Sequence, residues 1–196
     1  MKSLSTLLSE FDGRKLTELE LYSKFKEIAK AAIYGGHFRV NEDYNVHIVE
    51  VEFYFHSEDE QFSTIHDFAM YHRGKGICYF PVGSLHPHRS GIDVTFEREG
   101  AYRASFLIRK YAIEEKNDYK IIDTPSYLPE DLFGYTGCIL GDGPRVKWVD
   151  TNFDDAPLES NPRIKVRAYD KQGHPLNDDK GNIQYDYRRW RFTKTT

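Results

Sequence analysis

Residues 37–113 constrain the fold more than any other part of this sequence. The region contains five stretches rich in Val, Ile, Phe and Tyr, a composition typical of β-strands. These stretches are 37–41, 45–55, 76–80, 91–97 and 102–113. Turn-forming residues separate them, and most of the gaps are too short for the helical crossovers that parallel strands need. The sequence therefore predicts an antiparallel, strongly curved sheet.

A helix is predicted to precede the sheet. Thr17 and Glu20 have the spacing of a capping box, and apolar residues at helical intervals follow them. Gly35 and Gly36 then end the helix, which places it at 17–34. The resulting fold class is α+β: a curved antiparallel sheet, partly barrel-like, with flanking helices in a single domain.

The rest of the chain adds an extension and a long excursion. A length of 196 residues fits one domain with one core. Residues 1–14 are expected to form an N-terminal extension, and residues 15–196 the α+β domain. Frequent Pro and Gly across 123–163 indicate an ordered excursion with one short helix. Two further strands are predicted at 163–170 and 187–193, joined by a polar loop with a hairpin turn.

Composition points to a soluble, cytoplasmic protein. No apolar run approaches the roughly 20 residues of a membrane helix, and the N-terminus lacks a signal-peptide pattern. Cys78 and Cys138 lie in apolar or Gly-rich surroundings, which predicts reduced, packed thiols rather than a disulfide or a zinc site. We expect the protein to be a monomer.

The net charge bears on the choice of partner. It is −4 at pH 7, with an isoelectric point of about 6.1. Domains that bind duplex DNA usually owe much of their affinity to a basic face. The composition indicates no such face overall, although a mildly acidic chain can still carry a local basic patch.

The stretch 45–55 presents the most informative side chains. Because side chains alternate between the faces of a strand, the two faces can be assigned from the sequence. The core face is predicted to carry Val49, Val51, Phe53 and Phe55. The other face would carry Glu50, Glu52 and Tyr54. Two carboxylates on one face repel each other unless a cation or a solvated cleft relieves them. One of them could therefore be a general base in a cleft, or both could lie on a solvated outer face.

Arg109 is the candidate cation for this face. It lies within an apolar strand, where an Arg is seldom left unpaired. We expect it to pair with Glu50, Glu52 or Asp93, and the sequence leaves open whether that ion pair is structural or catalytic.

His86 and His88 have the spacing of two metal ligands on one face of a strand. The cupin pattern contains such a pair, but it requires a Glu a few residues later, and Asp93 is the nearest acidic residue here. A metal-dependent enzyme that uses these residues is a third hypothesis, and we expect no metal. His66 could line a pocket.

Residues 48–54 resemble the active-site strand of the alkyladenine (3-methyladenine) DNA glycosylases. That family carries a Val-Glu-x-Glu-x-Tyr strand followed by an acidic segment and a His, and here Glu58-Asp59-Glu60 follows the strand. Further short motifs occur in the family's order: Gly76-Ile77-Cys78-Tyr79, Gly91-Ile92-Asp93-Val94, Leu107-Ile108-Arg109, Asp142-Gly143-Pro144, Asn161-Pro162-Arg163-Ile164 and Arg189-Trp190-Arg191-Phe192. The resemblance spans residues 30–193 and implies a glycosylase-like domain over 15–196.

The resemblance implies an activity, the hydrolysis of the N-glycosidic bond of an alkylated or deaminated purine in DNA. Glu52 would be the general base that deprotonates water, and Arg109 would help to hold that water. The partner would be DNA whose damaged base is flipped out of the duplex. A carboxylate can also stabilise the oxocarbenium-like transition state, and no metal or organic cofactor is implied.

The resemblance also implies the walls of a base pocket. Tyr54 and Tyr79 would sandwich the flipped base, and His66 would form a third wall. Asp93 stands where the family has an amide that discriminates among purines, and Val82 where it has a bulky Tyr wedge. These departures and the net acidity keep an alternative open: a non-catalytic or differently specific module of the same fold that binds a nucleobase or another small ligand.

Overall fold

The structure, a computed structural model, describes residues 2–59, 65–70, 77–116, 118–134, 145–152 and 156–195. Its helices are α1 (Leu4–Glu10), α2 (Glu18–Tyr34), the short 3₁₀ helix η1 (Pro125–Tyr127) and α3 (Leu128–Phe133). Its strands are β1 (Gly36–Val40), β2 (Tyr44–Ser57), β3 (Leu85–His88), β4 (Gly91–Thr95), β5 (Tyr102–Glu115), β6 (Asp118–Ile122), β7 (Val146–Asp150), β8 (Leu158–Asn161) and β9 (Arg191–Lys194). Cys138 and the Asp142-Gly143-Pro144 motif lie outside the described residues.

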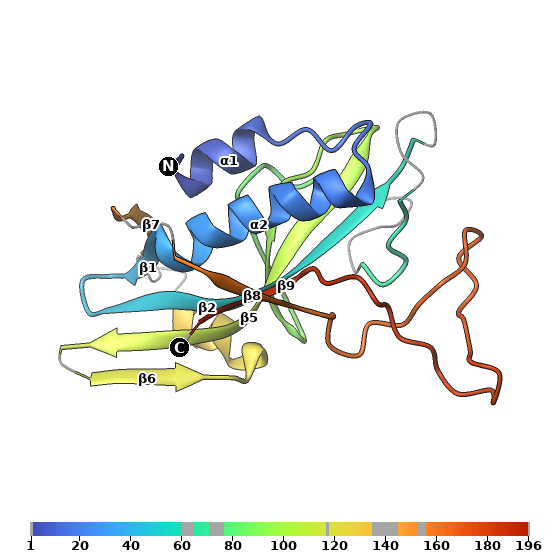
Figure 1. Ribbon diagram of the computed structural model, residues 1–196. Helices are drawn as coiled ribbons and strands as arrows, with labels where there is room; N and C mark the ends of the chain where they lie inside the picture. Colours follow the sequence, from blue (N-terminus) through green and yellow to red (C-terminus); the bar gives the residue numbers. More distant parts are fainter. Residues whose placement is uncertain are drawn as a thin grey trace.

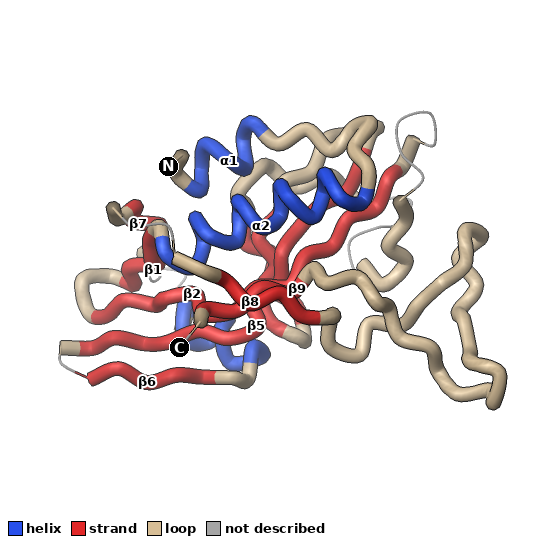
Figure 2. The backbone as a smooth tube through the Cα atoms, viewed as in Figure 1, coloured by secondary structure: helices blue, strands red, loops and turns tan. Residues whose placement is uncertain are grey.

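Within the described residues the strands form one nine-stranded sheet (Figure 1). Its main path runs β3-β4-β5-β2-β1-β7, while β6 pairs with β5, and β9 pairs with β2 and β8. These pairings are antiparallel. The sheet curls into a half-barrel, and α1 and α2 lie across one of its faces (Figure 2). The predicted α+β class, with a curved antiparallel sheet in a single domain, is confirmed.

Helix α2 begins where the capping box predicts. The Thr17 hydroxyl accepts the backbone N–H of Glu20 at 3.3 Å, and the Glu20 carboxylate accepts the N–H of Thr17 at 2.8 Å. These bonds satisfy donors at the helix start that have no partner within the helix. The side of α2 that faces the core carries Leu21, Phe25, Ile28, Ala29 and Ala32. Among the described residues, no helix, α2 included, is long and apolar enough to cross a membrane.

The N-terminal segment 1–14 contributes to the core. Ser3 caps α1 by accepting the N–H of Thr6 at 3.3 Å. The buried residues of α1 are Leu4, Leu7 and Leu8. They belong to the same hydrophobic cluster as α2, so the predicted extension packs on the domain through a short helix.

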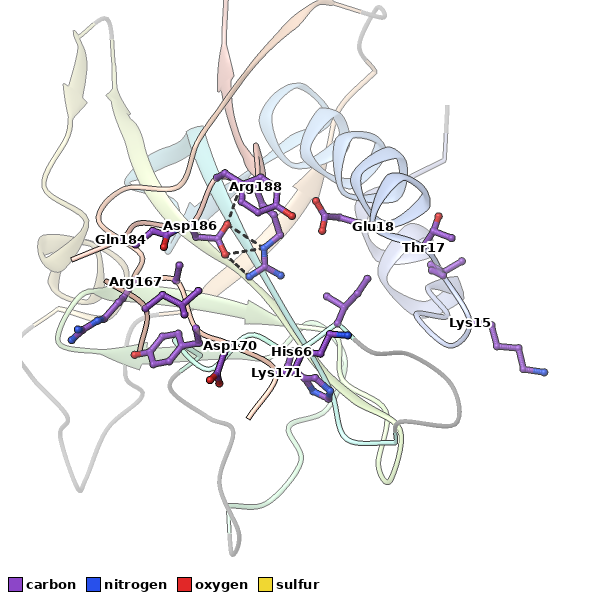
Figure 3. Close-up of a pocket in the computed structure, with 16 residues that line it drawn as sticks. Lys15, Thr17, Glu18, His66, Arg167, Asp170, Lys171, Gln184, Asp186 and Arg188 are labelled. Atoms are coloured by element: carbon purple, nitrogen blue, oxygen red, sulfur yellow. Dashed lines mark hydrogen bonds and ion pairs between the residues drawn. The ribbon is translucent and has the colours of Figure 1, made fainter. Parts of the chain in front are cut away.

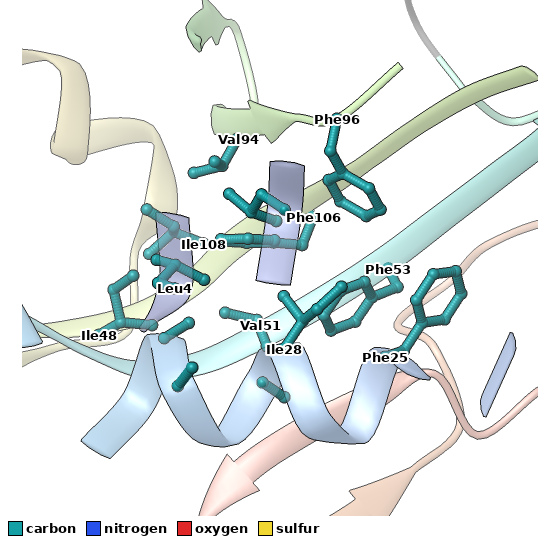
Figure 4. Close-up of a cluster of buried hydrophobic side chains, with 14 of the residues drawn as sticks. Leu4, Phe25, Ile28, Ile48, Val51, Phe53, Val94, Phe96, Phe106 and Ile108 are labelled. Atoms are coloured by element: carbon teal, nitrogen blue, oxygen red, sulfur yellow. The ribbon is translucent and has the colours of Figure 1, made fainter. Parts of the chain in front are cut away.

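Aromatic rings form the centre of the core between α2 and the sheet (Figure 4). Phe53 of β2 is fully buried and stacks on Phe25 of α2 with a centroid distance of 4.5 Å. It also contacts Phe106 of β5 at 5.5 Å and Phe192 of β9 at 5.8 Å. Large buried rings dominate the energy of such cores, so this cluster ties α2 to three strands.

Two shifts of register interrupt the pairing of β2 with β5, one caused by an extra residue in each strand. Across them the aligned pairs are Ile48 with Tyr111, Glu50 with Lys110, and Val51 with Ile108. Strand β2 therefore has one extra residue at Val49, and β5 has one at Arg109. Ile48 and Val51 both reach the core cluster, whereas Val49 lies outside it. The prediction that Val49 shares the core face with Val51 is wrong, because the bulge shifts the alternation by one residue.

The prediction of a strand at 76–80 is wrong for Ile77 to Phe80, the part of this stretch that the structure describes, because these residues form a loop. The carbonyl groups of this loop bind a side chain instead of a neighbouring strand. Arg103 donates to the carbonyl of Ile77 at 2.8 Å and to that of Cys78 at 2.9 Å. Cys78 is a free thiol, but it is exposed, so the prediction that it is packed is wrong.

Four strands, β3, β6, β7 and β8, lie outside the predicted ranges. Their side chains are mostly half-buried or exposed. They therefore lack the apolar composition by which the other strands can be recognised. The excursion at 123–163 holds η1 and α3, as expected of a short helix, and also β7 and β8.

Residues 163–190, called the arm below, extend away from the sheet (Figure 1). The strands predicted at 163–170 and 187–193 are wrong in extent: the first is irregular, and the second is regular only from Arg191 in β9. Lys165 has a positive φ of 53°, which breaks an extended strand. Isolated bridges join Arg167 with Tyr185, Tyr169 with Pro175, and Asn177 with Ile183. The last bridge spans the predicted hairpin turn.

Candidate functional site

Glu52 lies on the face of β2 that is turned away from the aromatic core, and it is fully buried. Its Oε1 accepts the Tyr54 hydroxyl at 2.5 Å, and its Oε2 accepts the backbone N–H of Ile164 at 2.7 Å. Arg109 Nη1 lies 4.0 Å from Oε1. The two predicted catalytic residues are thus together, with Arg109 at the outer limit of an ion pair and both carboxylate oxygens already bonded.

Glu50, the other carboxylate of this face, has its own partners. Its Oε2 accepts a hydrogen bond from Arg191 Nη1 at 3.1 Å and from the Thr193 hydroxyl at 2.7 Å. The repulsion between Glu50 and Glu52 is therefore relieved by two different arginines, Arg191 and Arg109.

Asp93 of β4 is buried on the same polar face. Its Oδ2 accepts the Ser105 hydroxyl at 3.3 Å, and His88 Nε2 lies 3.2 Å from its Oδ1. A cavity of about 10 Å³ is lined by Tyr54, Ala69, Met70, His88, Asp93 and Leu107. That volume holds about one water molecule and is far too small for a purine.

Tyr79 and His66 lie away from that cavity. The guanidinium carbon of Arg103 lies 3.6 Å from the centre of the Tyr79 ring, and the Tyr79 hydroxyl donates to Glu58. His66 Nδ1 lies 3.1 Å from the carbonyl oxygen of Ser57. Neither residue lines the cavity that Tyr54 shares with Asp93, and their roles as walls of a base pocket stay a prediction.

A buried ion cluster joins the polar face to the arm. The Arg163 side chain is fully buried, donates to Asp67 and lies 2.9 Å from Asp186. Its guanidinium carbon lies 5.0 Å from the centre of the Tyr54 ring and 5.5 Å from that of the Trp190 ring. Burial alone would lower the pKa of Arg163, but the two carboxylates raise it above its ordinary value, so the cation persists.

No local pattern in the sequence indicates this cluster. Arg163 belongs to a short motif to which the resemblance assigns no role, and none of the motifs contains Asp67 or Asp186. The contact between Arg163 and Asp67 spans 96 residues of the chain. The one available signal was that an Arg flanked by apolar residues needs a buried acidic partner.

An open groove of about 760 Å³ lies between the start of α2, His66 and the arm (Figure 3). Lys15, Thr17 and Glu18 border it at the helix. The charged and aromatic residues that the arm contributes are Arg167, Tyr169, Asp170, Lys171, Asp186, Tyr187 and Arg188. A volume of this size is typical of small-molecule sites. Of the predicted site residues, His66 alone is among its lining residues.

Arginines neutralise the buried carboxylate of the groove. Arg188 bonds Asp186 through Nε at 2.9 Å and Nη2 at 2.5 Å, and it lies 4.4 Å over the Trp190 ring. Burial on its own raises the pKa of Asp186, but the hydrogen bonds from Arg188 and the charge of Arg163 lower it below its ordinary value. Arg163 and Arg188 therefore neutralise the charge of Asp186. The exposed Lys171 also lines the groove, and its charge can attract an anion.

The histidine pair of β3 has Asp93 beside it, with His88 Nε2 3.2 Å from Asp93 Oδ1. The rings of His86 and His88 lie 6.1 Å apart. Across the described part of the chain, no three or more His, Cys, Asp or Glu side chains are grouped so that they could hold a metal ion.

Comparisons with known proteins found no relative. No protein-family model, no curated protein and no solved structure matches this chain. The chemistry of the site itself is therefore the basis for assigning a function.

Proposed function

We propose that the protein is a binding module and that the groove holds a nucleotide-like ligand, with an aromatic base and an anionic group. One observation supports this choice of site. The groove measures about 760 Å³, whereas Glu52 is fully buried with both carboxylate oxygens bonded, and the cavity near Asp93 measures only about 10 Å³. Ligand sites commonly measure about 300–1,000 Å³. The resemblance to a base-binding family implies a nucleobase as ligand, and His66, one of the residues that it implies for the base pocket, lines the groove.

The lining of the groove suits both halves of a nucleotide. Tyr187 is 75% exposed and offers a ring face for a base. Lys171 offers charge-assisted hydrogen bonds to a phosphate, and Arg167, whose Nη2 donates to Asn177 Oδ1 at 3.0 Å, adds positive charge to the groove. Glu18 and Asp170 also line the groove and would repel additional negative charge, which favours a monophosphate.

Calorimetric titration with AMP tests the proposal. We expect saturable binding, and we expect adenosine, which lacks the phosphate, to bind about tenfold more weakly. Lys171→Gln and Tyr187→Ala should each weaken AMP binding by about three- to tenfold, because each removes one contact worth roughly 1 kcal/mol.

Lys180→Gln is the matched control for these variants. Lys180 is exposed on the same arm but does not line the groove, so its substitution should leave AMP binding unchanged. Failure of AMP, GMP, CMP and UMP to bind at millimolar concentration would rule out the groove as a nucleotide site.

A second candidate function is hydrolysis of the N-glycosidic bond of a damaged purine in DNA. Its support is that Glu52 lies 4.0 Å from Arg109 and accepts the Tyr54 hydroxyl, the set that the resemblance implies. Glu52 would take a proton from water as the water attacks the sugar carbon and the base departs. Water has to gain access to Glu52 first, because the side chain is fully buried and accepts the N–H of Ile164 at 2.7 Å.

DNA that contains 1,N6-ethenoadenine, hypoxanthine or 3-methyladenine tests this candidate at enzyme excess. If the protein is this hydrolase, chromatography will detect the free base. Glu52→Gln will then lower the rate of base release by at least ~100-fold, because the substitution removes the general base. Glu42→Gln is the matched control, because the Glu42 side chain is 81% exposed and remote from Glu52. If none of the three DNAs loses its base, the hydrolase is excluded and the binding module stands.

A further inference from the structure

We infer that the arm and the groove together hold a single strand of nucleic acid, with one nucleotide in the groove and its neighbour stacked on the arm. The inference rests on the proposed function, because it takes the ligand of the groove to be one unit of a polymer. The charge of the arm, its exposed tyrosines and their continuity with the groove support it.

The arm is opposite in charge to the chain as a whole. Its residues 163–190 include seven Lys or Arg and four Asp, whereas the whole chain has 27 Lys or Arg and 31 Asp or Glu. The exposed cations of the arm are Lys165, Lys171, Lys180 and Arg189. A polymer of phosphates gains from such a local patch even when the net charge of the protein is negative.

Two exposed tyrosines lie on one face of the arm. Tyr185 is 51% exposed and Tyr187 75% exposed, while Asp186 between them is buried. The bridge between Arg167 and Tyr185 is flanked by backbone hydrogen bonds of 2.8 and 2.9 Å. Directly opposed residues share a face, so Arg167 and Tyr185 lie on the same face of the arm, where Arg167 Nη2 donates to Asn177 Oδ1 at 3.0 Å.

The spacing of these side chains suits consecutive nucleotides. Residues i and i+2 of an extended segment are about 7 Å apart, a separation that one nucleotide unit of an extended strand can span. Every base has a π-face, so stacking on Tyr185 and Tyr187 tolerates any sequence. Arg167, which donates to Asn177 Oδ1 at 3.0 Å, adds positive charge near the phosphate that joins the two bases.

The tyrosine face and the groove are continuous. Tyr187 and Arg167 belong to the face just described and also line the groove. A strand can therefore run from Lys171 and Arg188 in the groove, past Tyr187, to Tyr185 on the arm (Figure 3 shows the groove end of this path).

A single strand fits these features better than a duplex or an acidic peptide. A duplex hides the faces of its bases in its own stack, so the tyrosines would have no ring to contact. An acidic peptide would engage the cations but supply no planar partners for the tyrosines. Base stacking combined with backbone charge is the chemistry of single-strand binding.

Fluorescence anisotropy with labelled oligothymidine and oligouridine of about 12 nucleotides tests the inference. We expect each oligomer to bind at least about tenfold more tightly than its monophosphate, which is measured by calorimetry. The affinity should fall on the order of tenfold between about 50 and 200 mM salt, as expected when roughly three phosphates release counterions. The oligomer that binds more tightly shows whether the bound strand is DNA or RNA.

Substitution of both tyrosines separates stacking from charge. Tyr185→Ala combined with Tyr187→Ala should weaken oligomer binding at least about tenfold, with an unchanged circular dichroism spectrum because both side chains are exposed. Tyr127→Ala is the matched control, since Tyr127 is 56% exposed but lies in η1.

Each contrary result has a distinct meaning. Equal affinity for the monophosphate and the oligomer would overturn the single-strand inference and leave the proposed function intact. Binding of neither would overturn both. Equal affinity for a duplex of the same length, or full oligomer binding by the double tyrosine variant, would overturn the inference by showing that charge alone attracts the polymer.

Discussion

Replacing Arg163 by Met is expected to lower the free energy of unfolding by about 3–5 kcal/mol. Met retains an unbranched apolar side chain but removes the guanidinium that lies between Asp67 and Asp186. Asp67 is only 2% exposed, so water cannot replace the missing cation. An uncompensated buried charge costs more than the contact that is lost, because the charge stays desolvated in the folded state.

Urea unfolding followed by circular dichroism measures this difference. Lys165→Met makes a similar change two residues along the arm at an exposed side chain, and it should alter the free energy of unfolding by less than about 0.5 kcal/mol. Adding Asp67→Asn to Arg163→Met should recover part of the loss, since it removes one unpaired charge. A loss below about 1 kcal/mol for Arg163→Met would contradict the role assigned to the cluster.

Phe53→Ala is expected to destabilise the protein by a similar amount, about 3–5 kcal/mol. Phe53 is fully buried between rings from α2, β5 and β9. Its neighbours belong to separate elements whose positions are set by the sheet and by the helix, so they cannot all move inward to fill the space. The lost transfer energy and the remaining cavity therefore add together.

Thermal and urea unfolding check the effect of Phe53→Ala. Leu19→Ala is the matched control, because Leu19 is 75% exposed on α2, and removing its side chain should change the free energy of unfolding by less than about 0.5 kcal/mol. If Phe53→Ala costs no more than Leu19→Ala, the aromatic cluster is not the centre of the core.

Much of the fold is predictable because its signals are local. The capping box of Thr17 and Glu20 involves residues three positions apart, and the structure contains both of its hydrogen bonds. The strand pattern from 37 to 113 predicts the antiparallel sheet by composition and spacing. The bulge at Val49 and Arg109 is different, because the apolar alternation continues through Val49 in the sequence. Which residue is extra depends on the partner strand.

The site is predictable only in part. The rule that an Arg in an apolar strand needs an acidic partner limits the partner of Arg109 to Glu50, Glu52 or Asp93, and the structure places Glu52 4.0 Å from it. The same rule applies to Arg163, but its partners lie far away in the sequence and could not be chosen from it. The groove combines the start of α2, His66 and the arm, and only folding brings these segments together.

The sequence alone predicts the α+β class, the start of α2 and the apolar and polar faces of β2 from Val51 onward, because helix caps and side-chain alternation depend on residues a few positions apart. The burial of Glu52 and the groove beside the arm are visible only in the folded protein. The Glu52 carboxylate is occupied by the N–H of Ile164, which is 112 residues away along the chain. Burial and cavity shape depend on such distant contacts, and no local pattern encodes them.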